Sequence, residues 1–179
     1  MFNNIYKSKK VLITGNTGFK GSWLTIWLLK LGANIYGISK DIPTEPSMFN
    51  EIGLKNKVTH YKDNVKDLDS IVRIIDEIKP DFIFHLAASA YVPYSFDHPL
   101  EVNEANTIGT LNILEATKLL PNLKRIVCTS SSEVYGSALT KSINEDHPLN
   151  PTSPYAASKV AADRYCYSYI KTYNLPLTI

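Results

Sequence analysis

Residues 9–32 decide the fold of this 179-residue chain, and they read KKVLITGNTGFKGSWLTIWLLKLG. The apolar run after the two lysines predicts a short, buried, parallel strand over 10–14. A second apolar segment, ended by Gly32, predicts a helix over 19–31. The stretch therefore indicates a strand, a glycine-rich turn and a helix in direct succession.

Three glycines, Gly15, Gly18 and Gly21, form the turn with the spacing G-x-x-G-x-x-G. The spacing allows a tight turn at Gly15, a close approach of a ligand to Gly18, and close packing of Gly21 on the strand. The N-terminus of the helix adds N–H donors and positive partial charge, which suit phosphate groups. The turn predicts a dinucleotide pyrophosphate site; a glycine-rich turn without a ligand is the alternative.

Strand and helix patterns alternate along the rest of the chain, which indicates a parallel sheet covered on both faces. We predict a doubly wound α/β domain of Rossmann type over 1–179, with strand order 3-2-1-4-5-6. The expected strands lie near 10–14, 34–38, 57–61, 81–85, 124–129 and 175–179. The expected helices lie near 19–31, 67–78, 98–119 and 155–173, with a short one near 47–53. Segment 136–154, polar and rich in proline, is expected to be a surface loop.

The composition is that of an ordinary globular domain, with 44% apolar and 20% charged residues and a net charge of +2. This balance gives no reason to expect a nucleic-acid or membrane partner. Two cysteines, Cys128 and Cys166, suggest free thiols and a reducing cytoplasm. Four scattered histidines lack metal-ligand spacing, so no metal site is expected.

A second informative stretch carries Ser131, Tyr155 and Lys159. Tyr155 and Lys159 are four residues apart, so a helix places them on one face. A nearby ammonium favours the phenolate form of a tyrosine over the phenol. The Ser131 hydroxyl can orient the phenol and a substrate oxygen. The three residues therefore predict removal of a proton from an alcohol while a hydride leaves its carbon.

The glycine spacing and the Ser/Tyr/Lys set together resemble the extended short-chain dehydrogenase/reductases that act on nucleotide sugars. Segments 85–89 and 106–110 also match, and in that family they line the nicotinamide half of the cofactor site. Residues 15–24 and 42–49 are similar to CDP-glucose 4,6-dehydratases, and Ser131-Ser132-Glu133 is similar to GDP-mannose 4,6-dehydratases. Members of the family carry a further substrate-binding lobe, which we expect to be absent from this chain.

The resemblance implies NAD as the cofactor, with NADP as the alternative. Asp41 matches an acid that would bind ribose hydroxyls, and Lys40 matches a basic position that would favour a 2′-phosphate. Asn64 stands where the family has an aspartate that contacts adenine, and Asp63 could replace it if the register slips by one residue. The implied cofactor contacts are Gly15, Thr17, Gly18, Phe19, Lys20, Gly21, Ser39, Lys40, Asp41, Asn64, Val65, Leu86, Ala87, Ala88, Asn106, Tyr155 and Lys159.

The implied reaction is a redox-neutral 4,6-dehydration of a nucleotide-diphosphate sugar. Tyr155, Lys159 and Ser131 would act at the C4 hydroxyl, Glu133 would remove the C5 proton, and Ser132 would help the C6 hydroxyl to leave. A 4-epimerase and a UDP-glucuronate decarboxylase are the enzymatic alternatives, and a non-catalytic NAD(P)-binding module is the alternative of another class. The resemblance also implies a homodimer formed through helices 98–119 and 155–173.

Overall fold

Strand β1 (Lys10–Thr14) lies between β2 (Asn34–Ser39) and β4 (Phe82–His85) and is parallel to both. Its apolar residues Val11, Leu12 and Ile13 have no exposed surface. Successive side chains of a strand point to opposite faces, so Val11 and Ile13 enter one core and Leu12 enters the other. A continuous apolar run is therefore what a strand covered on both faces requires.

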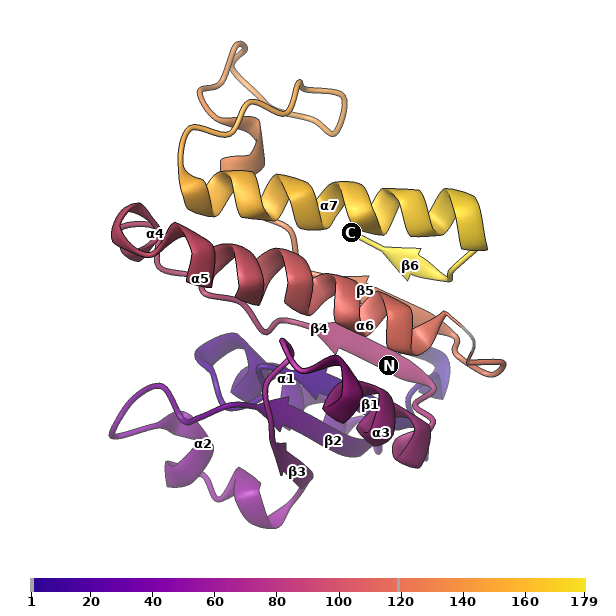
Figure 1. Ribbon diagram of the computed structural model, residues 1–179. Helices are drawn as coiled ribbons and strands as arrows, with labels where there is room; N and C mark the ends of the chain where they lie inside the picture. The colour runs from indigo at the N-terminus through magenta and orange to yellow at the C-terminus, as the bar shows by residue number, and fades with distance from the viewer. Residues whose placement is uncertain (1, 119) are drawn as a thin grey trace.

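The computed structural model describes residues 2–118 and 120–179, and its six parallel strands follow the order β3-β2-β1-β4-β5-β6 (Figure 1). This confirms the predicted Rossmann-type fold and strand order. The remaining strands are β3 (Thr59–Lys62), β5 (Arg125–Cys128) and β6 (Leu177–Thr178). The helices are α1 (Phe19–Lys30), α2 (Met48–Glu51), α3 (Leu68–Ile78), α4 (Tyr94–Asp97), α5 (Pro99–Asn103), α6 (Gly109–Thr117) and α7 (Pro154–Tyr173). Short turns η1 (Phe2–Asn4), η2 (Leu54–Asn56), η3 (Glu104–Ile108) and η4 (Ser132–Tyr135) complete the chain.

The two cores lie on opposite faces of the sheet. The larger one joins the sheet to α3, α6 and α7, and the smaller one joins it to α1. Figure 1 shows α7 running alongside the α5–α6 segment, with the loop 136–154 projecting beyond the start of α7. A cleft opens at the carboxyl ends of the strands, beside the neighbouring strands β1 and β4. From β1 the chain continues to β2 on one side of the sheet, and from β4 it continues to β5 on the other side.

Two strands begin two residues later than predicted, while the ends of the other strands lie within one residue of the prediction. The strand expected over 57–61 begins at Thr59, because the Lys57 N–H donates to the Leu54 carbonyl and keeps that residue in a turn. The strand expected over 175–179 is reduced to Leu177–Thr178 at the sheet edge. The Leu175 N–H donates back to the Tyr169 carbonyl, and Pro176 has no N–H to donate to a ladder.

The helix expected over 98–119 is divided into α5, η3 and α6, preceded by α4, and its expected last residue lies outside the described residues. The middle piece, η3, is a π-helical turn. A π turn changes the side-chain phase, and here the neighbours Asn106 and Thr107 are both buried and both hydrogen-bonded to Ser158 of α7. The interruption is therefore the consequence of two consecutive residues contacting one partner helix.

Candidate active site

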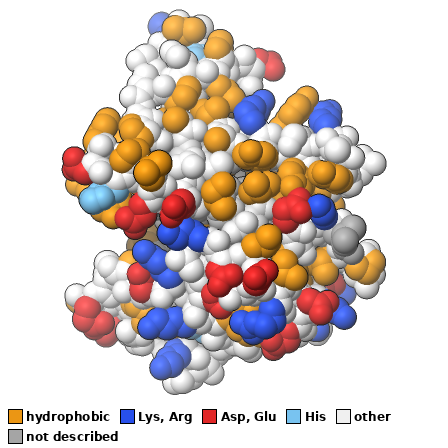
Figure 2. Space-filling model, in the orientation of Figure 1, with side chains coloured by type: hydrophobic (Ala, Val, Ile, Leu, Met, Phe, Trp, Pro, Cys, Tyr) orange, Lys and Arg blue, Asp and Glu red, His pale blue; other side chains and the backbone are white. Residues whose placement is uncertain are grey.

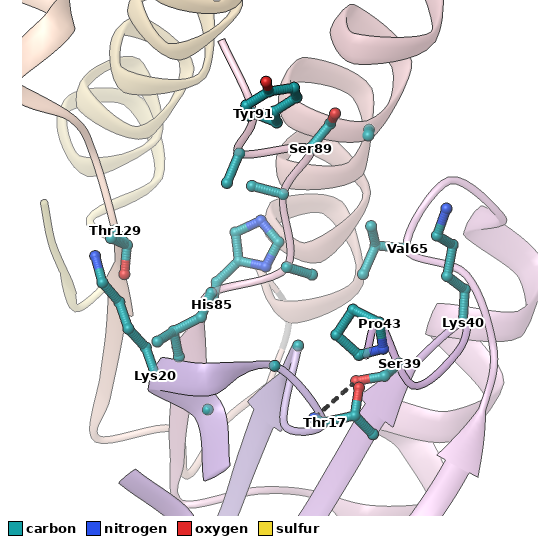
Figure 3. Close-up of a pocket in the computed structure, with 18 of the residues that line it drawn as sticks. Thr17, Lys20, Ser39, Lys40, Pro43, Val65, His85, Ser89, Tyr91 and Thr129 are labelled. Atoms are coloured by element: carbon teal, nitrogen blue, oxygen red, sulfur yellow. Dashed lines mark hydrogen bonds between the residues drawn. The ribbon is translucent and has the colours of Figure 1, made fainter. Parts of the chain in front are cut away.

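A cleft of about 1280 Å³ opens at the carboxyl ends of β1, β2, β4 and β5. In a doubly wound sheet this is where ligands bind. Figure 3 shows Lys20 and Thr129 on one side of this cleft and Ser39, Lys40 and Pro43 on the other. The face shown in Figure 2 has an indentation at its left edge, between the upper and lower parts of the molecule. Acidic and basic side chains lie beside this indentation.

The glycine-rich turn forms the floor of the cleft. Gly15 has a φ of +75°, and a Cβ there would meet the backbone nitrogen of Ala87 at 2.9 Å. Gly18 is the extended N-cap of α1 and has no side chain to close that helix end. The first turn of α1 contains no acidic residue but does contain Lys20. The end of α1 is therefore suited to an anion such as a pyrophosphate.

The second and third glycines make different demands, and two variants separate them. A Cβ on Gly21 would lie 2.1 Å from the Gly15 carbonyl oxygen, whereas a Cβ on Gly18 meets nothing in the protein closer than 3.4 Å. We expect Gly21→Ala to lower the free energy of unfolding by about 3 kcal/mol. We expect Gly18→Val to fold with near wild-type stability but to lose dinucleotide binding. Urea unfolding and calorimetric titration with NAD⁺ measure the two effects, and equal NAD⁺ affinity in wild type and Gly18→Val would contradict the site.

The end of β2 supports the turn through buried polar contacts. Ser39 donates to the side-chain oxygen of Asn16 at 2.9 Å and accepts from the Thr17 N–H at 3.4 Å, the contact drawn in Figure 3. Thr17 in turn donates to the Asp41 carbonyl at 2.7 Å. Asn16 is fully buried and did not figure in the sequence prediction. The sequence feature that could have pointed to Asn16 is the glycine at position 37, because a Cβ there would lie 2.2 Å from the Asn16 side chain.

Lys40 and Asp41, the candidates for cofactor selectivity, both line the cleft. Their side chains are mostly exposed and form an ion pair at 3.6 Å. An exposed pair of this kind contributes little to stability, so both groups stay free to turn towards a ribose or a phosphate. The roles of Asp41 in selecting NAD and of Lys40 in selecting NADP stay predictions.

Asn64 and Val65 line the wall opposite the glycine turn, together with Asp63. The Asn64 side-chain oxygen accepts from the Lys66 N–H at 3.1 Å. The Asp63 carboxylate accepts from the Asn64 N–H at 2.8 Å and pairs with Arg73 at 3.6 Å. Asp63 therefore has its charge partnered within the protein, while Asn64 keeps its amide group at the cleft.

Of the cofactor contacts expected after β4, Leu86, Ala87 and Ala88 line the cleft, but Asn106 does not reach its surface. Asn106 is 1% exposed and bonds both backbone groups of Ser89, at 2.7 and 3.1 Å. Its amide also donates to the Ser158 hydroxyl at 2.9 Å. Asn106 therefore connects the loop after β4, which lines the cleft, to α7 without itself lining the cleft.

The predicted catalytic residues come from two elements. Ser131 and Ser132 lie at the start of η4, after β5, and Tyr155 and Lys159 lie on α7; all four line the cleft. α7 begins here because Pro154 occupies its first turn and the Ser153 hydroxyl accepts from the Ala156 N–H at 3.1 Å. Glu133 is exposed beside the cleft, and its N–H donates to the Ser131 hydroxyl at 3.2 Å.

Lys159 is buried where a lysine usually is not, at 7% exposure. Its ammonium donates to the Thr129 carbonyl at 2.6 Å. Burial lowers the pKa of Lys159, and the Lys20 charge acts in the same direction, while Asp163 opposes it. The side chain therefore lies across the end of β5, one turn along α7 from Tyr155.

His85 at the end of β4 is buried and hydrogen-bonded on both ring nitrogens. Its Nδ1 lies 2.7 Å from the Thr14 hydroxyl and its Nε2 lies 3.0 Å from the Thr110 hydroxyl. The Thr14 hydroxyl also accepts from the Ala87 N–H at 3.2 Å. Burial, followed by the charge of Lys159, lowers the pKa of His85 to about 3. The neutral ring thus joins the ends of β1 and β4 to α6.

This pKa predicts a window of acid sensitivity. An unfolded histidine binds a proton near its ordinary pKa of 6.5, whereas folded His85 does so only near 3. The free energy of unfolding should therefore fall as the pH drops from 6.5 towards 3, with a His85 contribution of about 2 kcal/mol by about pH 5. Urea unfolding across this range should show a shallower pH slope for His85→Gln than for wild type. The exposed His98→Gln variant is the control, and an unchanged slope in His85→Gln would contradict the assignment.

Two features are absent from the described residues. No helix in residues 2–118 and 120–179 is long and apolar enough to cross a membrane. Within the same ranges, no group of three His, Cys, Asp or Glu side chains is placed to hold a metal ion.

Comparisons with known proteins agree with this geometry. The chain is 33% identical to CDP-glucose 4,6-dehydratase of Salmonella typhimurium over 97% of its own length and 48% of that protein. It is 37% identical to dTDP-D-glucose 4,6-dehydratase of Dictyostelium discoideum, over 96% of the chain and 42% of that protein. The chain thus spans about half the length of the curated relatives it matches.

A solved structure shows the same fold. The UDP-glucose 4-epimerase of Thermus thermophilus in complex with NAD superposes with a TM-score of 0.83 at 29% identity, over 94% of this chain and 53% of that one. The profile of the GDP-mannose 4,6-dehydratase family matches residues 12–179. This match covers nearly the whole chain, and it places the protein in the GDP-mannose 4,6-dehydratase family.

Proposed function

We propose that this chain provides the cofactor site and the catalytic groups of a nucleotide-sugar 4,6-dehydratase. The observation that carries the proposal is a single cleft that contains both predicted sets of residues. The glycine turn at Gly15 and Gly18 lies in the same cleft as Ser131, Tyr155 and Lys159. The identified relatives support the reaction type, because the two described above are named as 4,6-dehydratases.

NAD is the proposed cofactor. The residues present fit it, because the glycine turn leaves a cradle without side chains at the N-terminus of α1 and the cleft runs from there to Tyr155. The Thermus thermophilus epimerase, which has the same fold, was solved with NAD bound. When bound, NAD⁺ would supply an acceptor for the sugar C4 hydride and a donor that returns it to C6.

The protein's own groups would handle the protons. Tyr155 takes the proton of the C4 hydroxyl, the Lys159 ammonium stabilises the phenolate, and Ser131 donates a hydrogen bond to the C4 oxygen. A C4 ketone makes the C5 proton acidic, and Glu133 removes it as general base. Loss of the C6 hydroxyl as water, with help from Ser132, leaves a double bond between C5 and C6. Return of the hydride to C6 and of a proton to C5 would then give the 4-keto-6-deoxy sugar.

Glu133 separates this reaction from simple 4-epimerisation, which needs no base at C5. The 4-epimerase remains the second candidate because the solved neighbour described above is an epimerase. A UDP-glucuronate decarboxylase and a non-catalytic NAD(P)-binding module are the further alternatives to be tested.

We also propose that the protein forms a homodimer in the cytoplasm. Exposed apolar residues on α5 and α7 support this, among them Leu100, Tyr165, Tyr167 and Tyr173. Figure 2 shows apolar side chains gathered over this part of the molecule. Tyr169 on the same helix packs inwards and donates to Glu115. The free thiols of Cys128 and Cys166 suit a reducing compartment.

A panel of substrates tests the function. The longest form of the protein that the gene encodes is incubated with NAD⁺ and, separately, CDP-glucose, GDP-mannose, dTDP-glucose, UDP-glucose or UDP-glucuronate. We expect one of the first three to lose one molecule of water, seen by mass spectrometry. Conversion of UDP-glucose to its C4 epimer would favour the epimerase, and release of carbon dioxide from UDP-glucuronate would favour the decarboxylase. NAD⁺ binding without turnover of any sugar would favour the non-catalytic module.

A further inference from the structure

Helix α7 carries a nearly buried carboxylate that the proposed reaction does not use. Asp163 lies four residues after Lys159 and eight after Tyr155, so it shares their face of the helix. Its side chain is only 10% exposed. Aspartate is rarely buried unless it is paired, so its partners indicate what it does.

The partners of Asp163 lie in the turn that carries the catalytic serines. One carboxylate oxygen accepts from the Ser130 hydroxyl at 3.2 Å. One helical turn earlier, the Lys159 ammonium donates to the Thr129 carbonyl at 2.6 Å. Two consecutive residues after β5 are thus tied to α7 by two consecutive turns of the helix. The next residue is Ser131, which the proposed reaction places at the sugar C4 oxygen.

The second partner of Asp163 is Arg164, and this contact is more exposed to solvent than the one with Ser130. The other carboxylate oxygen of Asp163 accepts from the Arg164 Nε at 3.0 Å. The Arg164 side chain is 54% exposed, so solvent screens this contact. The contact with Ser130 is the part-buried one.

The charge of Asp163 also acts on Lys159, which lies one helical turn earlier on α7. The groups that act on the Lys159 ammonium are Cys128 on β5, Cys166 and Asp163 on α7, and Lys20 on α1, while His85 on β4 feels its charge in turn. Asp163 is the carboxylate in this set. Burial lowers the pKa of Lys159 and Asp163 acts to raise it, so the acid favours the ammonium form.

We propose that Asp163 is a positioning residue of this site, which holds the Ser130–Ser131 turn against α7 and places a negative charge one helical turn from Lys159. The turnover part of this proposal rests on the proposed function. The charge part does not, because it concerns the ionisation of Lys159 in the protein without substrate.

Two variants of Asp163 separate its hydrogen bond to Ser130 from the effect of its charge on Lys159. Asp163→Asn keeps an oxygen that can accept from Ser130 but loses the charge, whereas Asp163→Ala loses both. Arg164→Gln is the matched control, since it removes the solvent-exposed partner and leaves the carboxylate. Circular dichroism and NAD⁺ affinity verify folding, and Asp163→Asn keeps the test usable if Asp163→Ala does not fold.

The first readout is the titration of Lys159 itself, by carbon NMR of protein labelled at the lysine ε-carbon. The Lys159 signal is identified by its loss in Lys159→Arg. We expect it to titrate at a lower pH in Asp163→Asn than in wild type, because a nearby negative charge is lost, and not lower in Arg164→Gln. Titration of Lys159 at the same pH in wild type and Asp163→Asn would overturn the charging role, whether or not the protein turns over any sugar.

The second readout is kcat against pH with the nucleotide sugar that the wild type converts. We expect Asp163→Ala to lose about a hundredfold in kcat through misplacement of Ser131. Asp163→Asn should recover most of this loss where Lys159 is charged, with its alkaline limb shifted to lower pH. Wild-type kcat in Asp163→Ala would overturn the holding role, as would equal losses in the Asn and Ala variants. If wild type converts no sugar, the proposed function fails, and the NMR titration still decides the charging role.

Discussion

Replacing Tyr155 with Phe is expected to reduce kcat about 10³-fold while the dissociation constant of NAD⁺ stays within a factor of about two. The variant removes one oxygen atom, the proton acceptor of the proposed reaction. Tyr155 is 9% exposed, so its ring is packed and Phe fits the same space. Among the described residues, no hydrogen bond from the Tyr155 phenol to another residue is found. The loss should therefore be chemical, with little change in the free energy of unfolding.

Steady-state kinetics with the accepted nucleotide sugar and calorimetry with NAD⁺ measure these two quantities. Tyr135→Phe is a matched control, because Tyr135 lies at the end of η4 and does not line the cleft. A Tyr155→Phe enzyme with more than about a tenth of wild-type kcat would remove Tyr155 from the role of general base.

Replacing Glu133 with Gln is expected to abolish product formation while C4 oxidation continues. The first half of the reaction needs Tyr155, Lys159 and Ser131, none of which is changed. Without a base at C5, elimination stops and no acceptor forms at C6. Reduced nicotinamide should therefore accumulate, up to one equivalent per active site, and its absorbance can be followed in a single turnover.

Glu133 is exposed, so Glu133→Gln should leave the free energy of unfolding unchanged. Glu145→Gln, an exposed acid in the 136–154 loop, is the control and should turn over normally. Normal dehydration by Glu133→Gln would assign the C5 base to another residue. An absence of both product and reduced cofactor would place Glu133 in the first half-reaction instead.

The central part of the fold could be predicted because its sequence pattern is local. Val11, Leu12 and Ile13 have to be apolar for a strand that packs on both faces, and Gly21 has to lack a Cβ for α1 to approach Gly15. Each requirement acts on residues a few positions apart. Strand order then follows from the right-handed crossovers of alternating strands and helices.

The interruption of the 98–119 helix could not be predicted, because its cause lies on another element. Asn106 and Thr107 turn inwards together to reach Ser158, some fifty positions later in the chain. The same contact explains why Asn106 does not reach the cleft. The buried position of Asn16 could not be predicted for a similar reason, since its partners Ser39 and His60 are distant in sequence.

The candidate catalytic residues could be predicted from the sequence because the chemistry of such a set is specific. A serine after a strand and a Tyr-x-x-x-Lys pair have one shared use when a dinucleotide turn precedes them. The structure brings Ser131, Tyr155 and Lys159 to one cleft, yet their roles stay predictions until turnover is measured. The sequence carries no signal for Asp163, because an acid on a helix is expected to be solvent-exposed and its contact with Ser130 is long-range.

The most direct test of the 4,6-dehydratase proposal is the reaction of the wild-type protein in deuterated water. With its nucleotide sugar and NAD⁺, the product should be a 4-keto-6-deoxy sugar with one deuterium at C5, because the C5 proton is removed to a protein base and replaced from solvent. Mass spectrometry and proton NMR of the isolated product measure both features. A C4-inverted hexose that carries no solvent deuterium would contradict the proposal and identify an epimerase.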